Sequence, residues 1–141
     1  MNAVRTLTWL DLGICASFAV PGVAALTFGV LDVASRALGF ADVVYPTGAA
    51  AFFVNLAGLF GVLWNVAMLS VRTPSLHQVD LVARLGVIGL IVYHIAVSGL
   101  SPVFLAFVAT EVVGAGFKLR WLPTLEPADA PSASAVDDAG R

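Results

Sequence analysis

Four long apolar stretches, separated by short connections, constrain this chain more than any other feature of its sequence. A bilayer core about 30 Å thick needs roughly 20 helical residues to cross it, and each stretch reaches or nearly reaches that length. Only 11% of the 141 residues are charged and 60% are hydrophobic, whereas a soluble domain has about 25% charged residues. The sequence therefore predicts an all-α integral membrane protein that forms a four-helix antiparallel bundle. Its surroundings, and its first expected interaction partner, are the lipids of the bilayer. The predicted spans are about residues 10–31, 48–71, 79–98 and 102–118.

The connections between the predicted spans differ in character. Residues 32–47 mix apolar and charged side chains, which suits a segment lying along the membrane interface. Residues 72–78 form a short polar loop, and residues 99–102 form a tight turn. Residues 123–141 are rich in Pro, Ala, Ser and Asp, so we expect a disordered cytoplasmic tail. Residues 1–122 then form one transmembrane domain.

The basic residues predict an orientation, because Lys and Arg in short loops favour the cytoplasmic side. With four spans, Arg36 lies on one side and five basic residues lie on the other: Arg5, Arg72, Arg84, Lys118 and Arg120. Both termini are therefore expected in the cytoplasm, and the protein in the inner membrane of a bacterial-type cell. The first 25 residues also resemble a cleavable signal peptide. The apolar run continues to Leu31, which favours a retained span, but the sequence leaves both alternatives open.

Several functional classes lack the residues that they require. The single cysteine, Cys15, excludes an intramolecular disulfide and a multi-cysteine metal site. No basic patch indicates nucleic-acid binding, and no phosphate loop or metal motif is present, so we expect no metal and no cofactor. A haem between two axial histidines is excluded, because His94 is the one histidine inside a predicted span.

Strongly polar side chains inside the predicted spans are the candidate functional residues, because such groups are costly in a bilayer and normally face the bundle interior. They are Asp11, Asn55, Asn65, Tyr93, His94 and Glu111. The helix rise of about 1.5 Å per residue places His94 roughly 6 Å, Asn55 roughly 10 Å and Glu111 roughly 14 Å from the outer end. At these depths the three side chains would meet if they shared a face.

Each candidate also has a purely structural interpretation. Asp11 suits the first turn of a helix, where the helix dipole favours a carboxylate. Asn55 and Asn65 suit interhelical hydrogen bonds, and His94 suits a hydrogen-bonded position near the outer interface. For Glu111 the structural alternative is a protonated side chain that joins two helices, although an intramembrane carboxylate indicates function by default.

A carboxylate and a histidine near one another, with an amide beside them, predict acid–base chemistry on a lipophilic small molecule, or the binding of one. Glu111 and His94 are the candidate catalytic residues, and the candidate ligand-binding residues are Asn55, Asn65, Tyr93 and Asp11. Two alternatives stay open. One is a proton-linked transport or channel subunit with Glu111 as its protonatable gate. The other is an accessory protein that binds a second copy or another membrane protein through faces of small residues.

The layout of residues 9–122 resembles the small bacterial four-helix membrane proteins grouped as DoxX-like. The resemblance is carried by four spans, by a glycine-containing first helix (DLGICASFAVPG, residues 11–22) and by a last helix of small residues (TEVVGAGF, residues 110–117). It implies an inner-membrane location, and it implies no particular activity.

Overall fold

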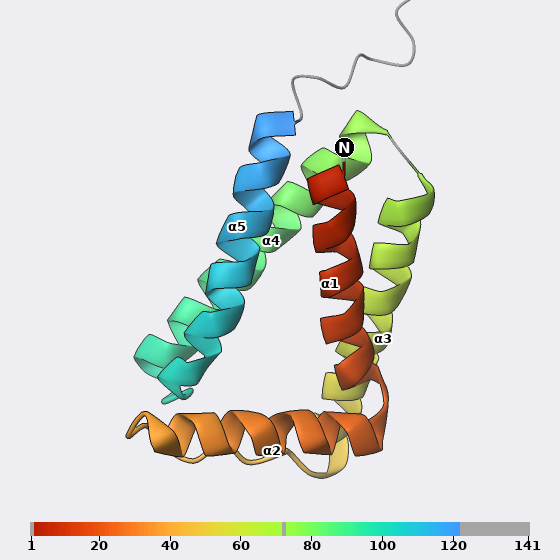
Figure 1. The fold of residues 1–141 in the computed structure, drawn as a ribbon. Coiled ribbons are helices and arrows are strands. Elements are labelled where there is room, and N and C mark those ends of the chain that lie inside the picture. The colour runs from red at the N-terminus through yellow and green to blue at the C-terminus, as the bar shows by residue number, and fades with distance from the viewer. Residues whose placement is uncertain (1, 72, 122–141) are drawn as a thin grey trace, which may run out of the picture.

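The computed structural model describes residues 2–71 and 73–121, and this part of the chain is all-α (Figure 1). It contains five α-helices and one short 3₁₀ turn. They are α1 (Asn2–Ala19), α2 (Pro21–Ala37), α3 (Gly48–Ser70), α4 (Pro74–Val97), η1 (Pro102–Phe104) and α5 (Leu105–Trp121). The predicted all-α class is confirmed. The tail predicted over residues 123–141 lies outside the described residues, as does Arg72.

The first predicted span, over residues 10–31, does not form one continuous helix. The chain breaks at Val20, and the axes of α1 and α2 are bent by 107°. Pro21 explains the break, since its ring locks φ, removes a backbone N–H and clashes with the carbonyl one turn earlier. Val20 is extended, with φ −104° and ψ 118°, as expected for a residue before proline. A proline at this position begins α2 instead of only kinking a longer helix.

Three helical segments are long and apolar enough to cross a membrane: Gly48–Ser70, Ser75–Val97 and Pro102–Arg120. The bent α1–α2 pair passes the same test jointly, as a broken span or a re-entrant segment. The described residues therefore supply three or four spans by length and composition.

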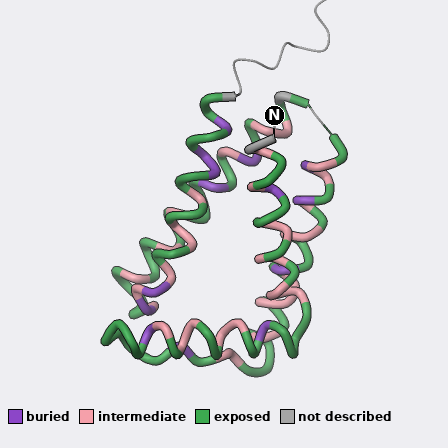
Figure 2. Tube along the Cα trace, viewed as in Figure 1, coloured by how far each residue is buried: buried purple, intermediate pink, exposed green. Residues whose placement is uncertain are grey.

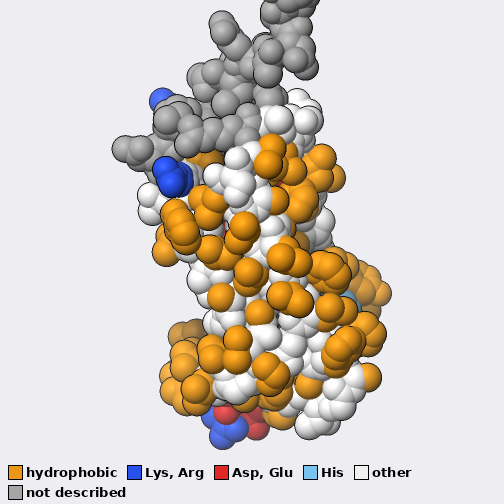
Figure 3. All heavy atoms as spheres, turned by 90° about the vertical axis from the view of Figure 1, so that its right-hand side faces the viewer, with side chains coloured by type: hydrophobic (Ala, Val, Ile, Leu, Met, Phe, Trp, Pro, Cys, Tyr) orange, Lys and Arg blue, Asp and Glu red, His pale blue; other side chains and the backbone are white. Residues whose placement is uncertain are grey.

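The side-chain distribution agrees with a lipid environment. The buried polar or charged side chains outnumber the buried hydrophobic ones among the described residues, while many large hydrophobic side chains are exposed, the reverse of a soluble protein. Figure 2 shows exposed residues along every helix. Figure 3 shows hydrophobic side chains covering most of one face, with charged side chains towards its two ends. A surface of this kind is suited to lipid.

The helices form two pairs that diverge from one another (Figure 1). Helix α1 packs along α3, and α4 packs along α5. Gly58 allows the first pair to approach closely, because a Cβ there would collide with the backbone of Phe18 and Ala19. The two pairs meet where α1 contacts α5, and the N-terminus and the end of α5 lie at the same end of the molecule.

Helix α2 lies across the opposite end and connects the two pairs (Figure 1). The hydroxyls of Ser35 on α2 and Ser101 before η1 are 2.6 Å apart, and Ser35 also donates to the Ala41 carbonyl at 2.6 Å. Asp32 accepts a hydrogen bond from the Val43 N–H at 2.8 Å, which holds the following loop. An aromatic cluster connects α2 and the loop after it with α1, η1 and α5, and its neighbouring ring centroids are 5.3–6.4 Å apart. Its members are Phe18, Phe28, Tyr45, Phe104 and Phe107.

The close approach at Gly58 generates a prediction. Gly58→Ala should lower the free energy of unfolding by about 1–3 kcal/mol, the usual cost of inserting a methyl group into a filled contact. The measurement is denaturant unfolding of the purified protein in detergent micelles. Gly89→Ala on α4 is the matched control, since a Cβ there meets nothing within 4 Å. Equal stability of the two variants would contradict the described α1–α3 contact.

Candidate functional site

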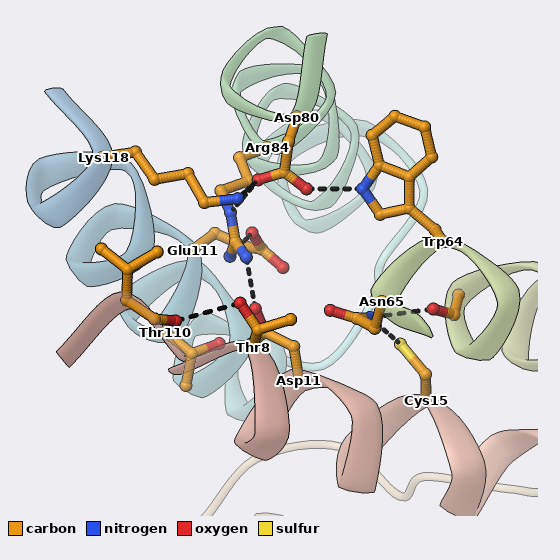
Figure 4. Close-up of polar contacts among 12 residues, drawn as sticks. Thr8, Asp11, Cys15, Trp64, Asn65, Asp80, Arg84, Thr110, Glu111 and Lys118 are labelled. Carbon is orange, nitrogen blue, oxygen red and sulfur yellow. Dashed lines mark hydrogen bonds and ion pairs between the residues drawn. The ribbon is translucent and has the colours of Figure 1, made fainter. Parts of the chain in front are cut away.

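The guanidinium of Arg84 on α4 pairs with three carboxylates from three helices (Figure 4). Its Nε lies 2.8 Å from Oδ2 of Asp80, one turn earlier on α4, and its Nη1 lies 2.8 Å from Oε2 of Glu111 on α5. Its Nη2 bonds to Oδ2 of Asp11 on α1. Only 7% of the Arg84 side chain is exposed. All three guanidinium nitrogens are therefore engaged in a buried site.

Asp80 is the second centre of this site. Beyond its pair with Arg84, it accepts a hydrogen bond from the indole Nε1 of Trp64 at 2.5 Å, and it pairs with the ammonium of Lys118. The side chains of Asp80 and Lys118 are 5% and 4% exposed. We call Asp11, Asp80, Arg84, Glu111 and Lys118 the ion cluster.

Helical spacing explains how the ion cluster assembles. Asp80 and Arg84 are four residues apart, and Glu111 and Lys118 are seven apart, so each pair lies on one face of its helix. Gly114 lies between Glu111 and Lys118 on the same face, and a Cβ there would lie 2.5 Å from Nη1 of Arg84. The absent side chain of Gly114 leaves the space that the guanidinium occupies.

The cluster holds three acidic and two basic groups, so it has one more acid than base. Buried charges are costly unless they are paired and hydrogen-bonded. Here every charged group has at least one partner of opposite charge. The surplus carboxylate nevertheless makes the cluster an acidic site that can accept a proton or a cationic group.

A pocket of about 560 Å³ lies beside the ion cluster, between α3 and α4, with α1 and α5 behind it. It is open on one side. Its lining is mostly apolar, and it includes four residues of the ion cluster. The lining residues are Asp11, Cys15, Phe60, Gly61, Leu63, Trp64, Asn65, Ala67, Asp80, Ala83, Arg84, Val87 and Glu111.

The structure brings together only part of the predicted site. Asp11, Asn65 and Glu111 line one pocket. His94 instead bonds to Ser98 at 2.9 Å at the other end of α4 and is exposed. It is ten residues from Arg84, which is about 15 Å along the helix. Tyr93 is 55% exposed and contacts the His94 ring edge to face. Neither side chain lies in the pocket that contains Glu111.

Asn55 also lies outside the pocket. Its Nδ2 donates to the Phe18 carbonyl at 2.8 Å, and its Oδ1 accepts from the Tyr45 hydroxyl at 3.3 Å. These contacts tie α3 to the end of α1 and to the loop after α2. The structural interpretation of Asn55, as an interhelical hydrogen bond, is therefore the one that its contacts match.

Arg84, Asp80, Lys118 and Trp64 were not predicted as site residues. For the orientation, Arg84 and Lys118 were counted with the loop charges although both lie within predicted spans, and in the structure both are buried within helices. A signal was present in the sequence. Asp80 and Arg84 lie four residues apart inside the predicted span of residues 79–98, which is the spacing of an ion pair on a helix.

Comparison with models of known protein families, with curated proteins and with solved structures returned no match. Within residues 2–71 and 73–121, no group of three or more His, Cys, Asp or Glu side chains is arranged to hold a metal ion. The candidate site is therefore described by its geometry alone. It consists of a buried ion cluster and the open pocket that four of its residues line.

Removal of the central cation gives the second prediction. Arg84→Gln leaves Asp11 and Glu111 without their basic partner and should lower the free energy of unfolding by about 3–5 kcal/mol, as expected for a broken buried ion pair. Denaturant unfolding in micelles measures the change. Arg36→Gln is the control, because the Arg36 side chain is 61% exposed in its pairs with Asp32 and Asp42. The two variants should differ clearly, and similar stabilities would contradict the central role of Arg84.

Proposed function

We propose that the protein binds a lipophilic small molecule in the pocket between α3 and α4, with a polar head against the ion cluster. One observation carries this proposal, namely that the lining of the open pocket is mostly apolar but includes four charged residues of the ion cluster. Phe60, Leu63 and Val87 line the pocket and are also 62%, 56% and 40% exposed on the apolar surface. A molecule dissolved in the bilayer would enter sideways between these residues.

Any acid–base chemistry at this pocket would use Glu111 and Asp11, because His94 lies at the far end of α4. Both carboxylates are held by Arg84. Binding is therefore the primary proposal, and a reaction on the bound molecule would be built on it.

For the membrane arrangement, we propose that α1, α3, α4 and α5 cross as an antiparallel four-helix bundle while α2 lies along the outer surface. Helix α1 has 18 residues, or about 27 Å, close to the thickness of the hydrocarbon core. The exposed Arg5 and Arg120 lie near the start of α1 and the end of α5, at the same end of the molecule, and Arg36 lies on α2. The positive-inside rule then supports cytoplasmic termini and an inner-membrane location. The DoxX-like resemblance stays a prediction from the layout.

This orientation predicts the behaviour of reporter fusions in a bacterial host. Green fluorescent protein fused after residue 141 should fluoresce, and alkaline phosphatase at the same position should be inactive, because each reporter folds on a different side of the inner membrane. Alkaline phosphatase inserted after Phe40, in the loop that follows α2, should be active. The reverse pattern would overturn the proposed orientation.

Filling the pocket tests the proposed binding. Three amphiphiles that share a dodecyl chain serve as probes: dodecanol, dodecanoate and dodecylamine. At least one should raise the unfolding temperature of the wild-type protein in micelles, because a ligand that binds the folded state stabilises it. Ala83→Phe places a ring in the pocket and should abolish that increase. Ala96→Phe, on the exposed surface of the same helix and outside the pocket lining, should retain it. Equal increases in both variants would contradict binding in this pocket.

A further inference from the structure

The charged groups that line the pocket are unequal in number. Asp11, Asp80 and Glu111 contribute three carboxylates, and Arg84 contributes the one basic group. Lys118 pairs with Asp80 and is not among the lining residues. A molecule in the pocket therefore meets more negative than positive charge.

Two of the carboxylates retain an oxygen for a ligand. Asp80 is saturated, because it takes bonds from Trp64, Arg84 and Lys118. Asp11 and Glu111 each give one oxygen to Arg84. Their second oxygens, Oδ1 and Oε1, accept no hydrogen bond within the described part of the chain. The side chains are 15% and 21% exposed, and both residues line the pocket.

Asn65 supplies a third acceptor from a third helix. It is only 5% exposed, and its Nδ2 donates to the Gly61 carbonyl at 2.8 Å and contacts Sγ of Cys15 at 3.7 Å. Because a carbonyl only accepts hydrogen bonds, the orientation of the Asn65 amide is fixed. Its Oδ1 accepts no hydrogen bond from any described residue, and Figure 4 shows it pointing towards the side of Asp11 and Glu111.

We propose that the head group of the bound molecule is a protonated amine, carried on an apolar body. This inference rests on the proposed binding function and specifies its ligand class. An ammonium has only donors and so matches the three acceptor oxygens of Asp11, Asn65 and Glu111. Its charge also neutralises the surplus carboxylate of the ion cluster. The aromatic rings of Phe60 and Trp64, which line the same pocket, attract cations as well.

Other ligand classes fit this pocket less well. A carboxylate or phosphate head would face three acidic groups, while the one lining cation, Arg84, is already bonded to all of them. A bare inorganic cation would leave most of the volume of about 560 Å³ and its apolar walls unused. A neutral alcohol can donate one hydrogen bond but leaves the surplus charge in place. The lipophilic ammonium uses both the oxygens and the walls.

Cys15 provides the readout, because it is the only cysteine of the chain and lines the pocket. The rate of its alkylation by N-ethylmaleimide is measured by mass spectrometry in phosphatidylcholine nanodiscs. Dodecylamine, dodecanol and dodecanoate are each titrated, and their mole fractions in the bilayer are compared. Dodecylamine should slow alkylation at a mole fraction at least tenfold below that needed with either of the others.

Neutralising the acceptor then tests the assignment. Glu111→Gln equalises the acids and bases of the ion cluster, so the variant should still fold, and it should weaken protection by dodecylamine about tenfold or more. Protection by dodecanol should be unchanged. Asp11→Asn gives an independent repeat from another helix. Asp42→Asn makes the same chemical change at a carboxylate outside the pocket, 63% exposed beside Arg36, and should behave as wild type.

The outcomes separate the two proposals. Protection by dodecanol or dodecanoate at the same or a lower concentration than dodecylamine would overturn the ammonium assignment and leave lipophile binding intact. Undiminished protection by dodecylamine in both Glu111→Gln and Asp11→Asn would also overturn it. If sodium chloride alone slowed the alkylation of Cys15, that result would also overturn the ammonium assignment and point to an inorganic cation instead. Absence of protection by all three amphiphiles would contradict the binding function itself.

Discussion

The fold depends on one guanidinium that three carboxylates share. Arg84 bonds to Asp80 on its own helix, to Glu111 on α5 and to Asp11 on α1. The two helix pairs otherwise diverge, so these bonds are a principal link between α1 and the α4–α5 pair. A buried charge without a partner is costly, so the ion cluster holds α1 against α4 and α5.

The pocket is a consequence of the same arrangement. Helix α2 connects the diverging pairs at one end through Ser35 and Ser101. The aromatic cluster joins α1, α2, η1 and α5 at the same end. Towards the other end Arg84 joins α1 to α4 and α5, and residues of these helices and of α3 line the open pocket. The side chains that join the helices, Asp11, Arg84 and Glu111, thus also line the pocket. This coincidence links the stability of the protein to the proposed ligand, because a bound cation would relieve the surplus negative charge.

The all-α class and the apolar helices were predictable, because long apolar stretches have few other outcomes. The break at Val20 was only partly predictable, since a proline inside an apolar run indicates a kink without giving its angle. Asp11, Asn65 and Glu111 were identified because polar groups in spans normally face the interior. His94 and Asn55 were predicted beside Glu111, but its partner in the structure is Arg84. Similar depth along the helices does not determine which face of each helix points inward. The burial of Arg84 and Lys118 was not predictable, because it depends on partners distant in the sequence: Asp11 and Glu111 for Arg84, and Asp80 for Lys118.

The most direct test of the central role of Arg84 is a double-mutant cycle between Asp11 and Arg84, measured as denaturant unfolding in micelles. The variants are Asp11→Asn, Arg84→Gln and the double substitution. Direct contact between residues 73 positions apart predicts that the single effects do not add, with a coupling energy of about 0.5–3 kcal/mol. Single effects that sum to the double effect within about 0.3 kcal/mol would show that α1 and α4 are not joined by this ion pair.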